Sequence, residues 1–166
     1  AKLGGVTRLE ELRRYSHGQG AGWADVGILR ANGFKVQEVS SYESLFPMVA
    51  AGRFDLLCRG ANELFDEYRL HRTIPGLAYD SSFVLVYPLP RFFFTSRENG
   101  KAIERVTRGL EIAYRDGSLQ KLWEAQYRES VDFAKLRSRR IFRLENPLIR
   151  NIDFDFRKYD YDPLKP

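Results

Sequence analysis

The stretch Ser16-His17-Gly18-Gln19-Gly20-Ala21-Gly22-Trp23 stands near the start of a chain of 166 residues. Its glycines predict a loop, and the residues after it predict a helix at about 24–32. Gly33 suits the left-handed position that ends such a helix. A glycine loop that leads into a helix start lets backbone amides approach an anion. We therefore expect ligand contacts in this segment.

Strand and helix patterns alternate around this stretch. The spacing of Thr7 with Glu10, and again of Ser40 with Glu43, is that of a capping box and predicts two helix starts. Pro47 lies inside the second of these helices and predicts that it starts late or is kinked. The predicted elements are a helix at 7–15, a strand at 34–39, a helix at 40–52, a strand at 54–58 and a helix at 62–70. This alternation predicts an α/β fold with a parallel sheet.

The second half of the chain carries two long helical patterns. Strand-like runs at 82–87 and 91–95 flank Pro88-Leu89-Pro90, which indicates a crossover between two lobes. Helices are predicted at 101–116 and 119–136, and a strand at 141–144. At 151–166 acidic and aromatic residues alternate, which predicts an extended arm with Asp153, Asp155, Asp160 and Asp162 on a solvated face.

Charge and cysteine content narrow the function classes. The net charge is 27 − 22 = +5, and the whole excess lies in residues 91–166, where 17 basic face 12 acidic side chains. The single cysteine, Cys58, excludes an internal disulfide and a multi-cysteine metal site. No apolar run approaches the roughly 20 residues that span a bilayer, and no secretory signal is visible. The basic cluster at 135–143 lacks a stacking platform, so we expect no nucleic-acid partner.

The order and spacing of several short motifs resemble those of the type 2 periplasmic solute-binding proteins of bacteria. The nearest group is the amino-acid-type family 3 of binding-protein-dependent transporters. The resemblance covers about Thr7 to Leu144. It is carried by Gly20-x-Gly22-Trp23-x-Asp25, Asn32-Gly33-Phe34, Tyr42-Glu43-x-Leu45-Phe46, Gly52-Arg53-Phe54-Asp55, Arg59-Gly60, Tyr87-Pro88-Leu89-Pro90 with 92–94, and Asp116-Gly117-Ser118-Leu119.

The resemblance implies two α/β lobes with parallel-rich sheets, flanked by helices and joined by two crossovers. Residues 1–87 would then be the second lobe. Residues 88–166 would be the carboxy-terminal part of the first lobe, with an extended tail. The amino-terminal half of that first lobe is not represented, so one lobe is expected to be incomplete.

The resemblance also implies ligand contacts in two segments. In the family, the glycine loop and the helix start hold the ligand's carboxylate; here these residues are Gln19, Gly20, Gly22 and Trp23. The family usually has a glycine followed by threonine or serine there, so the chain departs from the pattern. The alternative is a turn that needs glycine for steric reasons. Trp23 and Tyr42 are candidates for stacking on a ligand, with core packing as the alternative for both.

The second segment follows the predicted strand at 54–58, where open α/β sheets bind ligands. It offers Arg59, Gly60, Asn62 and Glu63. Amino-acid binders usually place an aspartate near Arg59 or Gly60 to hold the ligand's amino group, whereas a guanidinium suits a carboxylate or phosphate. The alternative is that Arg59 caps a helix or pairs with Glu63.

These observations favour a binding module rather than an enzyme. We expect a periplasmic protein that takes up a small polar solute, anionic or amino-acid-like, without a cofactor or metal, and that passes it to a membrane permease. Two alternatives stay open. One is a dehydratase-like enzyme of the same fold that acts on small carboxylates, with Glu63 as its acid or base. The other is the ligand-sensing domain of a signalling protein.

Overall fold

The computed structural model describes residues 3–159 of the chain, which form a mixed α/β structure with parallel strands. The first part contains α1 (Leu9–Leu12), β1 (Ser16–Gly20), α2 (Ala24–Ala31), β2 (Lys35–Val39), α3 (Tyr42–Ala50), β3 (Leu56–Leu57) and α4 (Leu64–His71). Its three strands form a parallel sheet in the order β2-β1-β3. The predicted strand–helix alternation of this part is confirmed.

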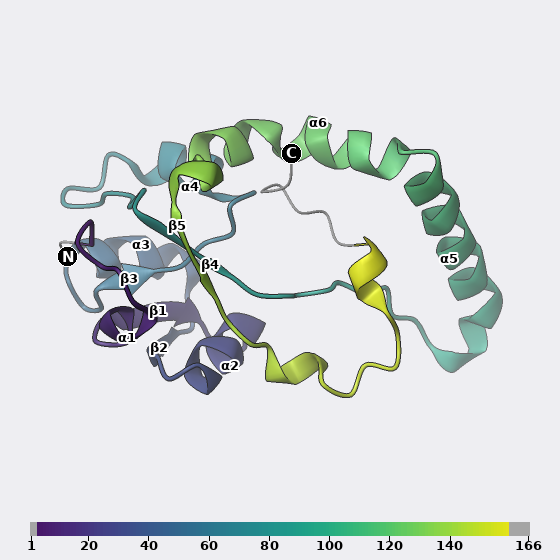
Figure 1. Ribbon diagram of the computed structural model, residues 1–166, viewed down its shortest axis with the longest axis horizontal. Coiled ribbons are helices and arrows are strands. Elements are labelled where there is room, and N and C mark those ends of the chain that lie inside the picture. Colours follow the sequence, from purple (N-terminus) through teal and green to yellow (C-terminus); the bar gives the residue numbers. More distant parts are fainter. Residues whose placement is uncertain (1–2, 160–166) are drawn as a thin grey trace.

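The second part contains β4 (Phe83–Val86), η1 (Arg97–Asn99), α5 (Gly100–Arg115), α6 (Ser118–Ala134), η2 (Leu136–Ser138), β5 (Arg140–Arg143), η3 (Pro147–Ile149) and η4 (Phe156–Tyr159). β4 and β5 pair in parallel, as a second, two-stranded sheet. Figure 1 shows an extended segment that leads from β4 away from the two sheets, and α5 and α6 as an arc that brings the chain back to β5. The prediction of two long helices here is confirmed. Within residues 3–159 no helix is both long and apolar enough to cross a membrane.

The predicted loop at the start of the glycine stretch is wrong, because Ser16–Gly20 is the central strand of the larger sheet. Its glycines serve packing rather than flexibility. A Cβ on Gly18 would lie 2.2 Å from the ring of Phe54, and a Cβ on Gly20 would lie 2.2 Å from the ring of Trp23. Two large rings therefore occupy the positions that side chains of the strand would fill. Only Ala21 to Trp23 connect the strand to α2.

Four further expectations differ from the structure. Residues 91–95 form no strand, and Phe92, Phe93 and Phe94 are 41%, 66% and 90% exposed. The capping of α1 uses Glu11 instead of Glu10, since its carboxylate accepts from the amides of Thr7 and Arg8. α3 begins at Tyr42 with Ser41 instead of Ser40 as its N-cap residue, and it includes Pro47, so the expected late start is wrong. Of the predicted carboxy-terminal arm, 156–159 form a short 3-10 helix, and 160–166 lie outside the described residues.

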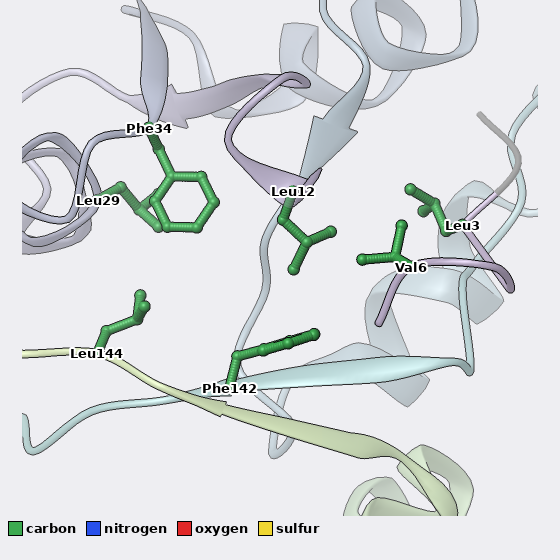
Figure 2. Packing of buried hydrophobic residues seen from close by; sticks show 7 residues of the cluster. All are labelled: Leu3, Val6, Leu12, Leu29, Phe34, Phe142 and Leu144. Carbon is green, nitrogen blue, oxygen red and sulfur yellow. The ribbon is translucent and has the colours of Figure 1, made fainter. Parts of the chain in front are cut away.

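The main hydrophobic core joins the two parts of the chain. Figure 2 shows Phe142 and Leu144, from the β5 segment, facing residues from the beginning of the chain. The buried members of this cluster are Leu3, Val6, Leu12, Leu29, Phe34, Phe142 and Leu144. Asn32 adds polar contacts, because its amide nitrogen donates to the Glu145 carbonyl at 2.7 Å and its oxygen accepts from the Glu145 amide at 3.1 Å.

Candidate functional site

The two predicted contact segments meet at one edge of the larger sheet. β1 and β3 are parallel neighbours, with Gly18 opposite Leu57, so their carboxyl ends point the same way. Trp23 follows the end of β1 and Arg59 follows the end of β3. This edge is where ligands bind in open α/β sheets.

Gly20, Trp23 and Arg59 form a stack at this edge. The Trp23 ring lies against Gly20, which has no side chain to prevent the approach. The Arg59 guanidinium carbon lies 4.7 Å from the centre of the Trp23 ring and 5.7 Å from that of Tyr42. A guanidinium over an aromatic face is attracted by the ring's charge distribution. Both rings thus lie beside the Arg59 guanidinium, and Trp23 also packs against the buried cluster of Val39, Leu45 and Phe54, as its core alternative expected.

Two glutamates of the α4 region hold Arg59. The Glu67 carboxylate accepts from Nε at 2.7 and 2.9 Å and from Nη2 at 2.6 Å, and Glu63 Oε2 accepts from Nη2 at 2.9 Å. The side chains of Arg59 and Glu67 are 14% and 10% exposed. Burial alone would lower the pKa of Arg59, but the hydrogen bonds and charges of Glu67 and Glu63 raise it. The ion pair between Arg59 and Glu63, which was the alternative to ligand binding, is therefore formed in the structure.

Glu67 also binds Tyr42. The Tyr42 hydroxyl donates to Glu67 Oε1 at 2.7 Å. Burial, followed by this hydrogen bond and the Glu67 charge, raises the pKa of Tyr42 to about 12, against the opposing charge of Arg59. One buried carboxylate therefore orients both the guanidinium and the phenol.

Gly60 allows the turn before α4 to close on itself. Its amide donates to Glu63 Oε2 at 3.3 Å, and a Cβ there would lie 2.7 Å from Asn62 Oδ1. The Asn62 and Glu63 side chains therefore fold over Gly60, close to Arg59. Gly22 lies apart from this group: it has a positive φ of 79°, and its amide donates to Glu38 of β2 at 3.4 Å.

Beneath the edge lie two buried polar side chains, those of His17 and Gln19, and the half-buried thiol of Cys58. Gln19 Nε2 donates to the Cys58 carbonyl at 3.2 Å, and Gln19 Oε1 has no partner within residues 3–159. His17 Nδ1 lies 3.4 Å from Cys58 Sγ. Burial raises the pKa of Cys58 to about 12 and lowers that of His17 to about 4. At neutral pH Cys58 is therefore an uncharged thiol and His17 a neutral imidazole. The pair lacks the thiolate that a cysteine nucleophile requires.

Asp25 and Tyr87 complete the neighbourhood. The Tyr87 hydroxyl donates to Asp25 Oδ1 from the position after β4. Burial, followed by the hydrogen bond to Asp25 and the Asp25 charge, raises the pKa of Tyr87, and the positive charge of Arg59 opposes this. Asp25 stands in the first turn of α2.

Sequence reasoning missed Glu67, Asp25 and Tyr87 as members of this group. The spacing of Glu63 and Glu67, four residues apart on one helix face, was a usable signal. Asp25 and Tyr87 both belong to quoted motifs, and Tyr87 is the last residue of a predicted strand. No signal in the sequence links Tyr42 to Glu67, because they lie on different helices.

Other candidate chemistry lies away from this edge. The described residues contain no group of three or more His, Cys, Asp or Glu that could hold a metal ion. A surface pocket of about 330 Å³ lies at the end of α6, lined by residues such as Leu136 and Lys135. Two arginines of the basic cluster bind backbone carbonyls: Arg139 those of Asp80, Phe83 and Ala134, and Arg140 that of Val6.

No protein-family model matches the chain, and comparison with curated proteins and with solved structures finds no significant match.

Proposed function

We propose that the chain is a solute-binding module of the type 2 periplasmic binding fold, and that it binds a small amino-acid-like solute at the carboxyl ends of β1 and β3. The observation that carries the proposal is the Trp23–Arg59 stack at this edge of the sheet. In this proposal the protein is periplasmic and delivers its solute to a membrane permease.

The charges at the edge favour a solute that carries both signs. Arg59 Nη1 has no acceptor within the described part of the chain, and α2 begins at Ala24 without a side-chain cap. Both suit a carboxylate. Asp25 and Glu63 supply acceptors for an ammonium group. The aspartate that amino-acid binders place near Arg59 or Gly60 is thus replaced by carboxyl groups from two other positions.

The enzyme alternative depends on Glu63, whose carboxylate accepts from Arg59 and from the Gly60 amide. These contacts do not favour catalysis by Glu63 over solute binding.

Calorimetric titration of the whole chain with the common L-amino acids tests the proposal. We expect at least one to bind, and its analogues without the amino or without the carboxyl group to bind at least about tenfold more weakly, which is about 1.4 kcal/mol. Arg59→Ala should reduce the affinity, whereas Arg143→Ala, an exposed residue far along the chain, should not. If no amino acid binds, or if Arg59→Ala binds as tightly as the unaltered chain, the proposal is wrong.

A further inference from the structure

The segment 91–95 leaves both its side chains and its backbone uncovered. Its sequence, Arg-Phe-Phe-Phe-Thr, contains the aromatic and β-branched residues that favour strands. The chain runs extended there (Figure 1), and Phe92, Phe93 and Phe94 are 41%, 66% and 90% exposed. None of the five amides of this segment donates to an acceptor within residues 3–159. The segment is therefore an open strand edge that carries three aromatic rings.

Whatever covers this segment has to pair its amides as well as bury its rings. A lipid surface would bury the rings, but hydrocarbon offers no acceptor to a backbone amide. A groove on a folded protein would bury the rings on one side only, because neighbouring side chains of an extended segment point to opposite faces. A second strand pairs the amides and brings side chains to both faces at once. These requirements favour a strand as the occupant.

The sequence of the segment fits a second copy of itself. In an antiparallel pair centred on Phe93, this residue lies opposite the partner's Phe93, and Phe92 lies opposite the partner's Phe94. Every phenylalanine then faces a phenylalanine, and aromatic cross-strand pairs stabilise sheets. This register also places Arg91 opposite Thr95. A parallel pair in register would instead bring two Arg91 guanidinium groups side by side, and like charges in that position are destabilising.

We propose that two copies of the chain associate through the segment 91–95, which pairs with itself as an antiparallel two-stranded sheet about a twofold axis. Such a contact uses the same surface of both copies, as in most homodimers. The exposed parts of the three rings amount to roughly 400 Å² per chain. A standard interface buries about 800 Å² per partner, so the dimer is weak and depends on protein concentration. This inference is independent of the proposed solute binding.

Sedimentation velocity of the whole chain, from micromolar to near-millimolar concentration, tests the proposal. We expect a monomer–dimer equilibrium in this range. Phe93→Lys sets two ammonium groups opposite each other and should weaken the dimer at least about tenfold. Leu70→Lys is the matched control, because it places the same charge at another exposed apolar residue, 71% exposed on α4, and should leave the dimer unchanged.

A charge exchange tests the register. Phe92→Glu and Phe94→Lys should each weaken the dimer. The double variant places a carboxylate opposite an ammonium group at two positions of the pair, so it should dimerise at least about threefold more strongly than either single variant. Hydrogen exchange gives a second readout, because amides within 91–95 should exchange more slowly as the concentration rises.

A chain that stays monomeric throughout would overturn the proposal, and so would one that stays monomeric and binds vesicles of anionic phospholipid instead. A dimer that Phe93→Lys leaves as stable as before would overturn it as well. So would a double variant that dimerises more weakly than both single variants. The substituted side chains are exposed, so the variants should keep the fold, which circular dichroism checks, and the unaltered chain alone decides the first outcome.

Discussion

Lowering the pH should destabilise the fold through one residue, His17. Its side chain is fully buried and packs edge-on against Phe34 at 4.8 Å between ring centres. Burial lowers its pKa from 6.5 to about 4, although the Asp55 charge opposes this. The unfolded chain therefore binds a proton at higher pH than the folded chain does.

The sign and size follow from these two values. Above about pH 6.5 the protonation of His17 does not change the free energy of unfolding. As the pH falls from 6.5 to 4 the unfolded chain takes up the proton first, so the free energy of unfolding decreases, and below pH 4 this decrease is complete. The complete decrease is about 3 kcal/mol, and about 2 kcal/mol of it has occurred by pH 5. This is a large fraction of the roughly 5–15 kcal/mol that stabilises a typical domain.

Urea unfolding followed by circular dichroism at pH 8, 7, 6 and 5 measures this loss. His17→Gln cannot gain a proton, so its free energy of unfolding should fall by about 2 kcal/mol less between pH 8 and 5 than that of the unaltered chain. His71→Gln is the control, because it removes the chain's other histidine, whose ring lies 3.9 Å from the Glu43 carboxylate, and leaves His17 in place. Parallel pH profiles of His17→Gln and the unaltered chain would refute the assignment of the loss to His17.

Three other outcomes follow from packing, hydrogen bonding and thiol burial. Gly18→Val should lower the free energy of unfolding by about 3 kcal/mol in thermal melts, because its Cβ meets a ring, whereas Gly5→Ala has open space and should change it little. Arg139→Ala should cost about 2 kcal/mol by leaving carbonyls unpaired, and the exposed Arg143→Ala less than about 0.5. Cys58, whose pKa is raised to about 12, should react with a thiol reagent at pH 8 at least about 100-fold more slowly in the folded than in the urea-unfolded chain.

The element order was predictable because the spacing of apolar residues follows helix and strand geometry, even in α5, which buries none of its residues. The helix patterns at 101–116 and 119–136 match α5 and α6 closely, and the strand at 34–39 matches β2. β1 was not predictable in this way, because glycine is depleted in strands and carries no side chain to show a period. The ring that packs on Gly18 comes from Phe54, far along the chain, so no local pattern indicates it.

The candidate site was predictable only within each segment. Trp23, Arg59 and Glu63 were named from local patterns, and the structure brings them together. The contact of Tyr42 with Glu67 joins residues 25 positions apart on two helices, which no local rule relates. Gly22 was named for its place in the glycine stretch, but its amide turns toward β2.

The composition of the main core has a consequence for the order of events during synthesis. Leu3 and Val6 share this core with Phe142 and Leu144. At about 5–20 residues per second, a ribosome needs roughly 7–30 seconds between making the first pair and the second. During that interval Leu3 and Val6 can pack on Leu12, Leu29 and Phe34 but lack the cover that Phe142 and Leu144 give in the folded chain. A nascent chain of this protein should therefore be a client of holding chaperones until residue 144 has left the exit tunnel.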